Sequence, residues 1–104
     1  MSTKRRKDLT AEEIMGILSA HAGTLRKLTV KKIGLFGSYV RKEQRKRSDV
    51  DFLVEFEEPT FDHFMDLAFA LEKVLGKKVD LITKGNLSPY IRPYVEKEVR
   101  WLEV

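Results

Sequence analysis

The sequence contains no cysteine and only three prolines among its 104 residues. The absence of cysteine excludes disulfide bonds and thiolate metal sites, and it is compatible with the reducing cytoplasm, where we expect this protein. No apolar run approaches the roughly 20 residues that a membrane-spanning helix needs. No signal-like apolar stretch follows the basic N-terminus. These absences favour a soluble protein that is stabilised by a packed core and has no membrane partner.

The composition is that of a folded domain with a basic surface. Hydrophobic residues make up 42% of the chain and charged residues 35%, with a formal net charge of +4. This charge favours polyanionic partners such as nucleotides, nucleic acid or an acidic protein face. Four consecutive basic residues occupy positions 4–7, with almost nothing nearby to bury. We therefore expect a flexible basic N-terminal arm over residues 1–9 and a single domain over residues 10–104.

The rest of the chain alternates between helical and strand patterns. A capping box at 10–13 begins a helix predicted over 11–27, whose apolar stripe includes His21 as a packed residue. Further helices are expected at 38–44, 61–75 and 88–97, and strands at 32–36, 49–56, 79–83 and 99–104. This order predicts an α+β fold, a small mixed β-sheet flanked by helices.

Three aspartates begin two of the predicted strands. Asp49 and Asp51 lie two residues apart, so their side chains leave the same strand face about 6.5–7 Å apart. Val50 and its apolar neighbours fix the opposite face toward the core. Asp80 begins another strand; if the two strands pair, its carboxylate lies about 4.8 Å from the first pair. Such close negative charges repel each other unless a cation lies between them, and Mg²⁺ prefers carboxylate oxygens.

A Gly-Ser turn lies ten residues before the first aspartate. Gly37 follows an apolar strand, and a glycine there allows a ligand to approach the backbone closely. Ser38 begins the next short helix, where free amides and a hydroxyl suit a phosphate group. The turn alone predicts only a change of chain direction. Together with the three carboxylates, it predicts a site for a divalent metal and a nucleoside triphosphate.

This combination of Gly37-Ser38, Asp49-x-Asp51 and Asp80 resembles the nucleotidyltransferases of the DNA polymerase β superfamily, especially the minimal nucleotidyltransferases of prokaryotes, which include MntA-type antitoxins. The resemblance covers essentially the whole chain. It implies a polymerase β palm-like fold, two Mg²⁺ ions held by Asp49 and Asp51, and Asp80 facing the acceptor. It also implies that Gly37 and Ser38 hold the triphosphate of ATP.

The basic residues Arg41 and Lys42 lie shortly after the Gly-Ser turn. Arg41, three residues beyond Ser38, is the best candidate among several basic residues for screening phosphate charge. Lys42 stands where many relatives carry glycine. A lysine in a left-handed turn costs about 1–2 kcal/mol, so the local turn is expected to differ.

The acceptor of the nucleotide is implied by the resemblance alone. The resemblance implies transfer of a nucleoside monophosphate, AMP in particular, to a hydroxyl group of a small helical HEPN-type toxin. Phe69 is a candidate contact residue on the polar side of its helix, whereas Tyr90 and Tyr94 are expected to pack. Hetero- or homo-oligomers are both compatible with the sequence.

Two other classes of function remain open. The chain could be a non-catalytic antitoxin that binds and masks its toxin. It could instead bind nucleic acid through its basic arm and loop, although the sequence has no basic stretch interleaved with aromatic residues and no known reader motif. A small-molecule acceptor is a further possibility within the same enzyme class.

Overall fold

The computed structural model describes residues 9–104. Its centre is a four-stranded mixed sheet in the order β3 (Val79–Thr83), β2 (Val50–Phe56), β1 (Val30–Phe36) and β4 (Arg100–Glu103). Strand β1 pairs antiparallel with both β2 and β4, whereas β2 and β3 are parallel. The expected α+β fold with a small mixed sheet is therefore confirmed.

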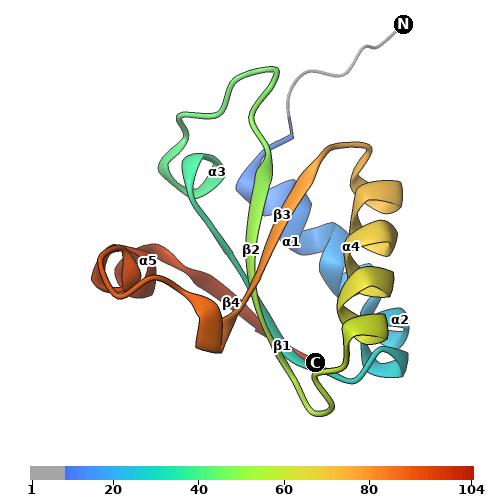
Figure 1. Ribbon diagram of the computed structural model, residues 1–104. Helices are drawn as coiled ribbons and strands as arrows, with labels where there is room; N and C mark the ends of the chain where they lie inside the picture. The colour runs from blue at the N-terminus through green and yellow to red at the C-terminus, as the bar shows by residue number, and fades with distance from the viewer. Residues whose placement is uncertain (1–8) are drawn as a thin grey trace, which may run out of the picture.

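Helices cover both faces of this sheet (Figure 1). Helices α1 (Ala11–Ala20), α2 (Ala22–Lys27) and α4 (Phe61–Leu75) lie on one side, and α5 (Arg92–Glu98) lies on the other. The single turn of α3 (Ser38–Arg41) follows β1, and a 3₁₀ turn, η1 (Lys84–Asn86), follows β3. Among the residues that the structure describes, no helix has the length and apolar character of a membrane span.

Strand β2 packs on both of its faces. The face predicted to be apolar lies in the larger core cluster and consists of Val50, Phe52, Val54 and Phe56. The opposite face contributes Leu53, which is also buried, to a smaller cluster with Phe36, Leu87 and Val95. The central position of β2 thus fixes its register from two sides, and with it the direction in which Asp51 points.

The first predicted helix is interrupted at His21. The capping box is present: the Glu13 amide donates to the Thr10 hydroxyl (3.1 Å), and the Thr10 amide donates to the Glu13 carboxylate (2.9 Å). His21 ends α1 and precedes α2, with its ring Nδ1 2.9 Å from the Ile17 carbonyl oxygen. It is exposed, so the prediction of a packed histidine was wrong.

The helix expected over 88–97 begins later. Ser88 and Pro89 form a turn in which the amides of Ile91 and Arg92 donate to the Ser88 carbonyl. Helix α5 itself spans Arg92–Glu98, with Ile91 as its N-cap, so the predicted start at position 88 was wrong. The predicted helix over 61–75 and the predicted strand over 79–83 have the bounds found for α4 and β3.

Most of the expected N-terminal arm lies outside the described residues. Leu9, its last residue, is buried in the larger core cluster. Its carbonyl oxygen accepts a hydrogen bond from Gln44 Nε2 (3.1 Å). The division into an arm and one domain stays a prediction.

Candidate active site

Asp51 and Asp80 are direct neighbours on the parallel strands β2 and β3. Neighbouring parallel strands place paired side chains on the same face about 4.8 Å apart. Asp51 is half-buried, whereas Asp80 is exposed. Burial raises the pKa of Asp51 to about 6, and the negative charges of Asp80 and Asp49 add to the effect. A bound cation would relieve this repulsion.

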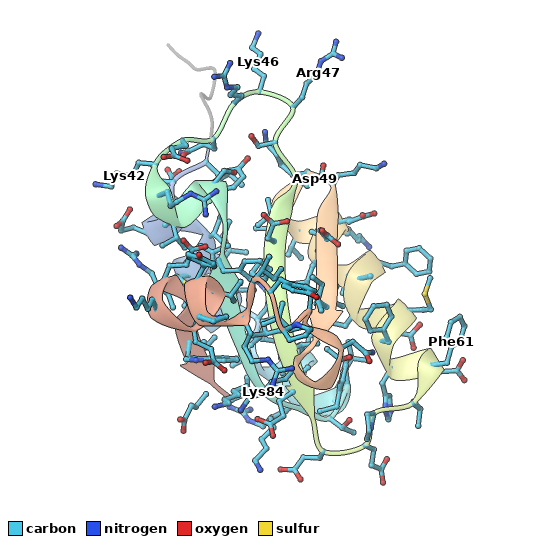
Figure 2. All side chains as sticks on the ribbon, turned by 60° about the vertical axis from the view of Figure 1, so that its left-hand side comes forward. Lys42, Lys46, Arg47, Asp49, Phe61 and Lys84 are labelled. Atoms are coloured by element: carbon cyan, nitrogen blue, oxygen red, sulfur yellow. The ribbon has the colours of Figure 1, made fainter. Side chains whose placement is uncertain are left out.

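Asp49 lies one residue before β2 and is exposed. The Val50 amide donates to the Lys78 carbonyl (2.9 Å), and the Val50 side chain is fully buried. Because neighbouring residues of an extended segment point to opposite faces, Asp49 and Asp51 share the face opposite Val50. Asp49 borders an open hollow of about 370 Å³ whose other lining residues are Lys46, Arg47, Ser48, Gly76, Lys77 and Lys78. Figure 2 shows Lys46 and Arg47 pointing outward beyond Asp49.

Gly37 joins β1 to α3 in a conformation that glycine alone adopts readily. Its φ is 87° and its ψ is −152°. A Cβ atom on Gly37 would collide with the carboxylate of Asp51. The residue is therefore required by the close approach of a site carboxylate to the backbone. This contact brings the Gly-Ser turn and the aspartates to the same end of the sheet.

Helix α3 ends in a left-handed turn at Lys42, which has a φ of 61°. The Glu43 amide donates to the Ser38 carbonyl (2.8 Å) across this turn. The lysine side chain points outward (Figure 2). The expectation that the turn would differ from a glycine-type turn was wrong, because Lys42 itself adopts the left-handed conformation. Ser38 is half-buried at the start of α3.

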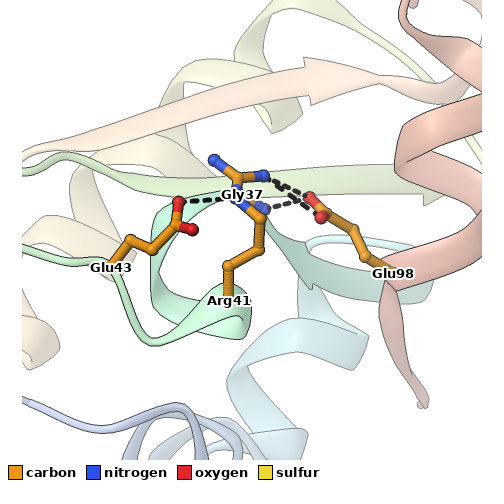
Figure 3. A network of polar contacts seen from close by, with 4 residues as sticks. All are labelled: Gly37, Arg41, Glu43 and Glu98. Atoms are coloured by element: carbon orange, nitrogen blue, oxygen red, sulfur yellow. Dashed lines mark hydrogen bonds and ion pairs between the residues drawn. The ribbon is translucent and has the colours of Figure 1, made fainter.

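Two glutamates that the sequence analysis did not identify hold Arg41 (Figure 3). Its Nε donates to Glu43 (3.0 Å), and its Nη1 lies 3.1 Å from both carboxylate oxygens of Glu98. The hydrogen bonds to Glu43 and Glu98 raise the pKa of Arg41. The amide of Gly37 also donates to Glu98 (2.7 Å).

The position of Glu98 follows from sheet register. Leu35 pairs with Arg100 in the antiparallel β1–β4 ladder. Continuing that register by two residues places Glu98 opposite Gly37. A sequence reader who had assumed this pairing could have found Glu98, but no motif marks it.

The predicted residues therefore share one end of the sheet. Asp51 contacts the Gly37 turn and pairs with Asp80, and Asp49 and Arg41 lie close enough to affect its pKa. Within residues 9–104, no three acidic, histidine or cysteine side chains are already grouped as a ready-made metal site. The available donors are carboxylate oxygens, which fit Mg²⁺, because this ion commonly takes one or two carboxylates and completes its shell with water and substrate phosphates.

Residues 18–102 match the sequence model of the Nucleotidyltransferase domain family. The chain belongs to this family and is a nucleotidyltransferase, which confirms the resemblance drawn from its motifs.

Individual relatives show which nucleotidyltransferases the chain is similar to. The chain is 50% identical over 93 residues to protein adenylyltransferase MntA of Thermococcus cleftensis, with 88% of this chain and 94% of that protein covered. A solved structure assigned as a minimal nucleotidyltransferase is 31% identical, with a TM-score of 0.76 and coverage of 91% and 98% of the two chains. A toxin–antitoxin structure with AMP-PNP is 26% identical, with a TM-score of 0.65 and coverage of 80% of this chain and 69% of that one.

Proposed function

We propose that this nucleotidyltransferase transfers AMP from ATP to a hydroxyl group of a partner protein, and that the partner is a HEPN-type toxin for which it serves as antitoxin. The proposal depends mainly on one arrangement: Asp51 pairs with Asp80 on the neighbouring strand and also lies against the Gly37 turn. The name of the Thermococcus relative supports protein adenylylation, and the toxin–antitoxin structure with AMP-PNP, an ATP analogue, supports both the donor and the partner.

Each site residue receives a role in this reaction. Asp49, Asp51 and Asp80 hold magnesium, two ions in the proposed arrangement. The bound metal would supply charge neutralisation at the reacting phosphate and at the leaving group. Ser38 offers its hydroxyl and Arg41 its guanidinium to the triphosphate, and Gly37 leaves room for the nucleotide beside the backbone.

The chemical step is a displacement at the α-phosphorus. The acceptor hydroxyl oxygen forms a bond to this atom as the bond to the bridging oxygen of the β-phosphate breaks, and pyrophosphate leaves. Asp80 takes the proton of the hydroxyl. The exposure of Asp80 on the edge strand β3 supports this role, because an acceptor on another protein must reach it from outside.

Substitution of the paired carboxylates tests this function. We expect Asp49→Asn and Asp51→Asn each to lower AMP transfer from α-labelled ATP to the partner by at least about 100-fold, since each removes a charged ligand while keeping the side-chain shape. Asp66→Asn changes an exposed acid on α4 and is the matched control. Circular dichroism checks that the variants fold. Transfer at the wild-type rate by both site variants would overturn the assigned roles.

Masking of the toxin is the second candidate function. Large apolar side chains are exposed at Phe69 (62%), Tyr90 (87%) and Tyr94 (72%). The expected packing of the two tyrosines was therefore wrong, and all three residues are available to a partner. The Asp49→Asn/Asp51→Asn double variant separates the two functions in cells that express the toxin. Full protection favours masking, whereas lost protection with an intact complex favours catalysis.

A further inference from the structure

The carboxylate of Glu98 connects α5 with both ends of α3. It accepts a hydrogen bond from the Gly37 amide (2.7 Å), and each of its two oxygens lies 3.1 Å from Arg41 Nη1. The Glu98 side chain is 19% exposed, whereas the Arg41 side chain is 49% exposed. The glutamate is therefore the more enclosed partner, and the arginine extends from it toward solvent.

The backbone around Glu98 is held in place by the sheet. Glu98 is the last residue of α5, and the amide of the next residue, Val99, donates to the Val95 carbonyl (2.9 Å). The Val99 side chain packs so closely on β1 that a Cβ atom on Gly34 would collide with it. Strand β4 then begins at Arg100. Glu98 is thus attached to a part of the molecule that cannot shift without disturbing the β1–β4 ladder.

The bonds to Arg41 leave one edge of its guanidinium open. A guanidinium carries five N–H donors in a rigid plane. Nε is directed to Glu43 and Nη1 to Glu98, while Nη2 has no hydrogen bond to any residue in the range 9–104. Two carboxylates therefore fix the orientation of the plane, and the Nη2 edge retains two donors for a further anion.

We propose that Glu98 is a positioning residue for the nucleotide: it fixes the Gly37 turn and the Arg41 guanidinium so that the Nη2 edge of Arg41 meets the triphosphate. This inference rests on the proposed function, since it assumes that Arg41 binds ATP. Fixing the guanidinium before the nucleotide arrives removes the entropy cost of ordering a long, exposed side chain. In the opposite arrangement, Glu98 would occupy the place of a phosphate and would have to leave when the nucleotide binds. Removal of its carboxylate would then tighten nucleotide binding.

Nucleotide binding by the purified chain tests the inference. We expect Glu98→Ala to weaken binding of Mg²⁺·AMP-PNP by about 10-fold or more in isothermal titration calorimetry, because a charge-assisted contact is lost. Glu98→Gln keeps an oxygen for the Gly37 amide and should retain part of the affinity, and it serves where the alanine variant does not fold. Glu96→Gln alters an exposed carboxylate on the same helix and should leave binding unchanged.

An Arg41→Ala background shows whether Glu98 acts through the arginine. We expect most of the effect of Glu98→Ala to disappear in that background, since coupled residues are not additive. In transfer assays, the KM for ATP should rise by a larger factor than kcat falls. An undiminished effect of Glu98→Ala in the Arg41→Ala background would overturn the positioning role, as would tighter nucleotide binding by the Glu98→Ala single variant.

The same titrations separate this inference from the proposed function. If the wild-type chain binds no Mg²⁺·AMP-PNP, the proposed function fails and the role of Glu98 fails with it. If the wild-type chain binds the nucleotide and Glu98→Ala and Glu98→Gln bind it equally well, only the inference about Glu98 is wrong.

Discussion

Burial and several neighbouring charges act on the ionisation of Asp51. It is half-buried, it lies beside Asp80, and Asp49 and Glu98 add further negative charge. Arg41 is the cation that counteracts them. In the absence of metal, an ionised carboxylate at this position is therefore unfavourable to the fold, and its pKa rises to about 6 from an ordinary value of 3.8.

This shift predicts how stability depends on pH. Because the folded state holds the Asp51 proton more tightly than the unfolded chain does, the folded state binds more protons between about pH 4 and pH 6, and stability falls as pH rises through that window. Asp51→Asn removes the charge and keeps the shape. We expect this variant to gain about 1 kcal/mol in free energy of unfolding at pH 8, a value reduced for solvent screening, and little at pH 3.5.

Urea denaturation in EDTA at the two pH values measures this difference. Asp66→Asn, on the exposed side of α4, should show no such dependence on pH. Equal or lower stability of Asp51→Asn at pH 8 would contradict the prediction.

The turn after α3 carries backbone strain that glycine would relieve. Lys42 has a φ of 61°, where a Cβ atom costs about 1–2 kcal/mol. Glycine avoids this cost but loses more chain entropy on folding. We therefore expect Lys42→Gly to raise the free energy of unfolding by about 0.5–1 kcal/mol. Thermal denaturation of both variants measures this gain. Lys42→Ala removes the same side chain without relieving the backbone, so its free energy of unfolding should not rise. A stabilised alanine variant would place the strain in the lysine side chain.

Some elements could be predicted from the sequence because local signals mark their ends. The amide of His63 donates to the Thr60 hydroxyl at the start of α4, and Gly76 ends the helix in a left-handed conformation. The interruption at His21 could not be predicted, because Ile14, Leu18 and Leu25 continue one apolar stripe across it. Periodicity reports which side chains face the core, and it does not report a change of axis.

The same limit applies to the site. The shared direction of Asp49 and Asp51 follows from the buried Val50 between them, and Asp80 follows from a strand pattern alone. The contacts of Glu98 with Gly37 and Arg41 depend on β4 lying beside β1. Gly37 and Glu98 are 61 positions apart in the sequence. Such long-range pairing has no local signal, so Glu98 can be identified only once the β1–β4 register is known.

At the scale of the whole molecule, charge is distributed unevenly. The chain has a formal net charge of +4, yet among the described residues named as shifting the pKa of Asp51, the carboxylates of Asp80, Asp49 and Glu98 outnumber the guanidinium of Arg41. A basic protein with a locally acidic end of its sheet should attract a divalent cation there and a polyanion around it. A metal bound together with a triphosphate satisfies both conditions.

Metal binding should therefore stabilise the fold measurably. A ligand at about 100 times its Kd adds about 2.7 kcal/mol to the free energy of unfolding, and 1 kcal/mol corresponds to about 4–8 °C in Tm for a domain of this size. We expect MgCl₂ to raise the Tm by several degrees over EDTA at matched ionic strength, and AMP-PNP to raise it further only when Mg²⁺ is present. KCl at the same ionic strength controls for screening. The Tm of the Asp49→Asn/Asp51→Asn double variant should not respond to Mg²⁺, because its amide side chains no longer supply charged oxygen ligands. The variant thus separates specific metal binding from general ionic screening. An equal Mg²⁺ response in this variant would show that the metal binds elsewhere on the chain.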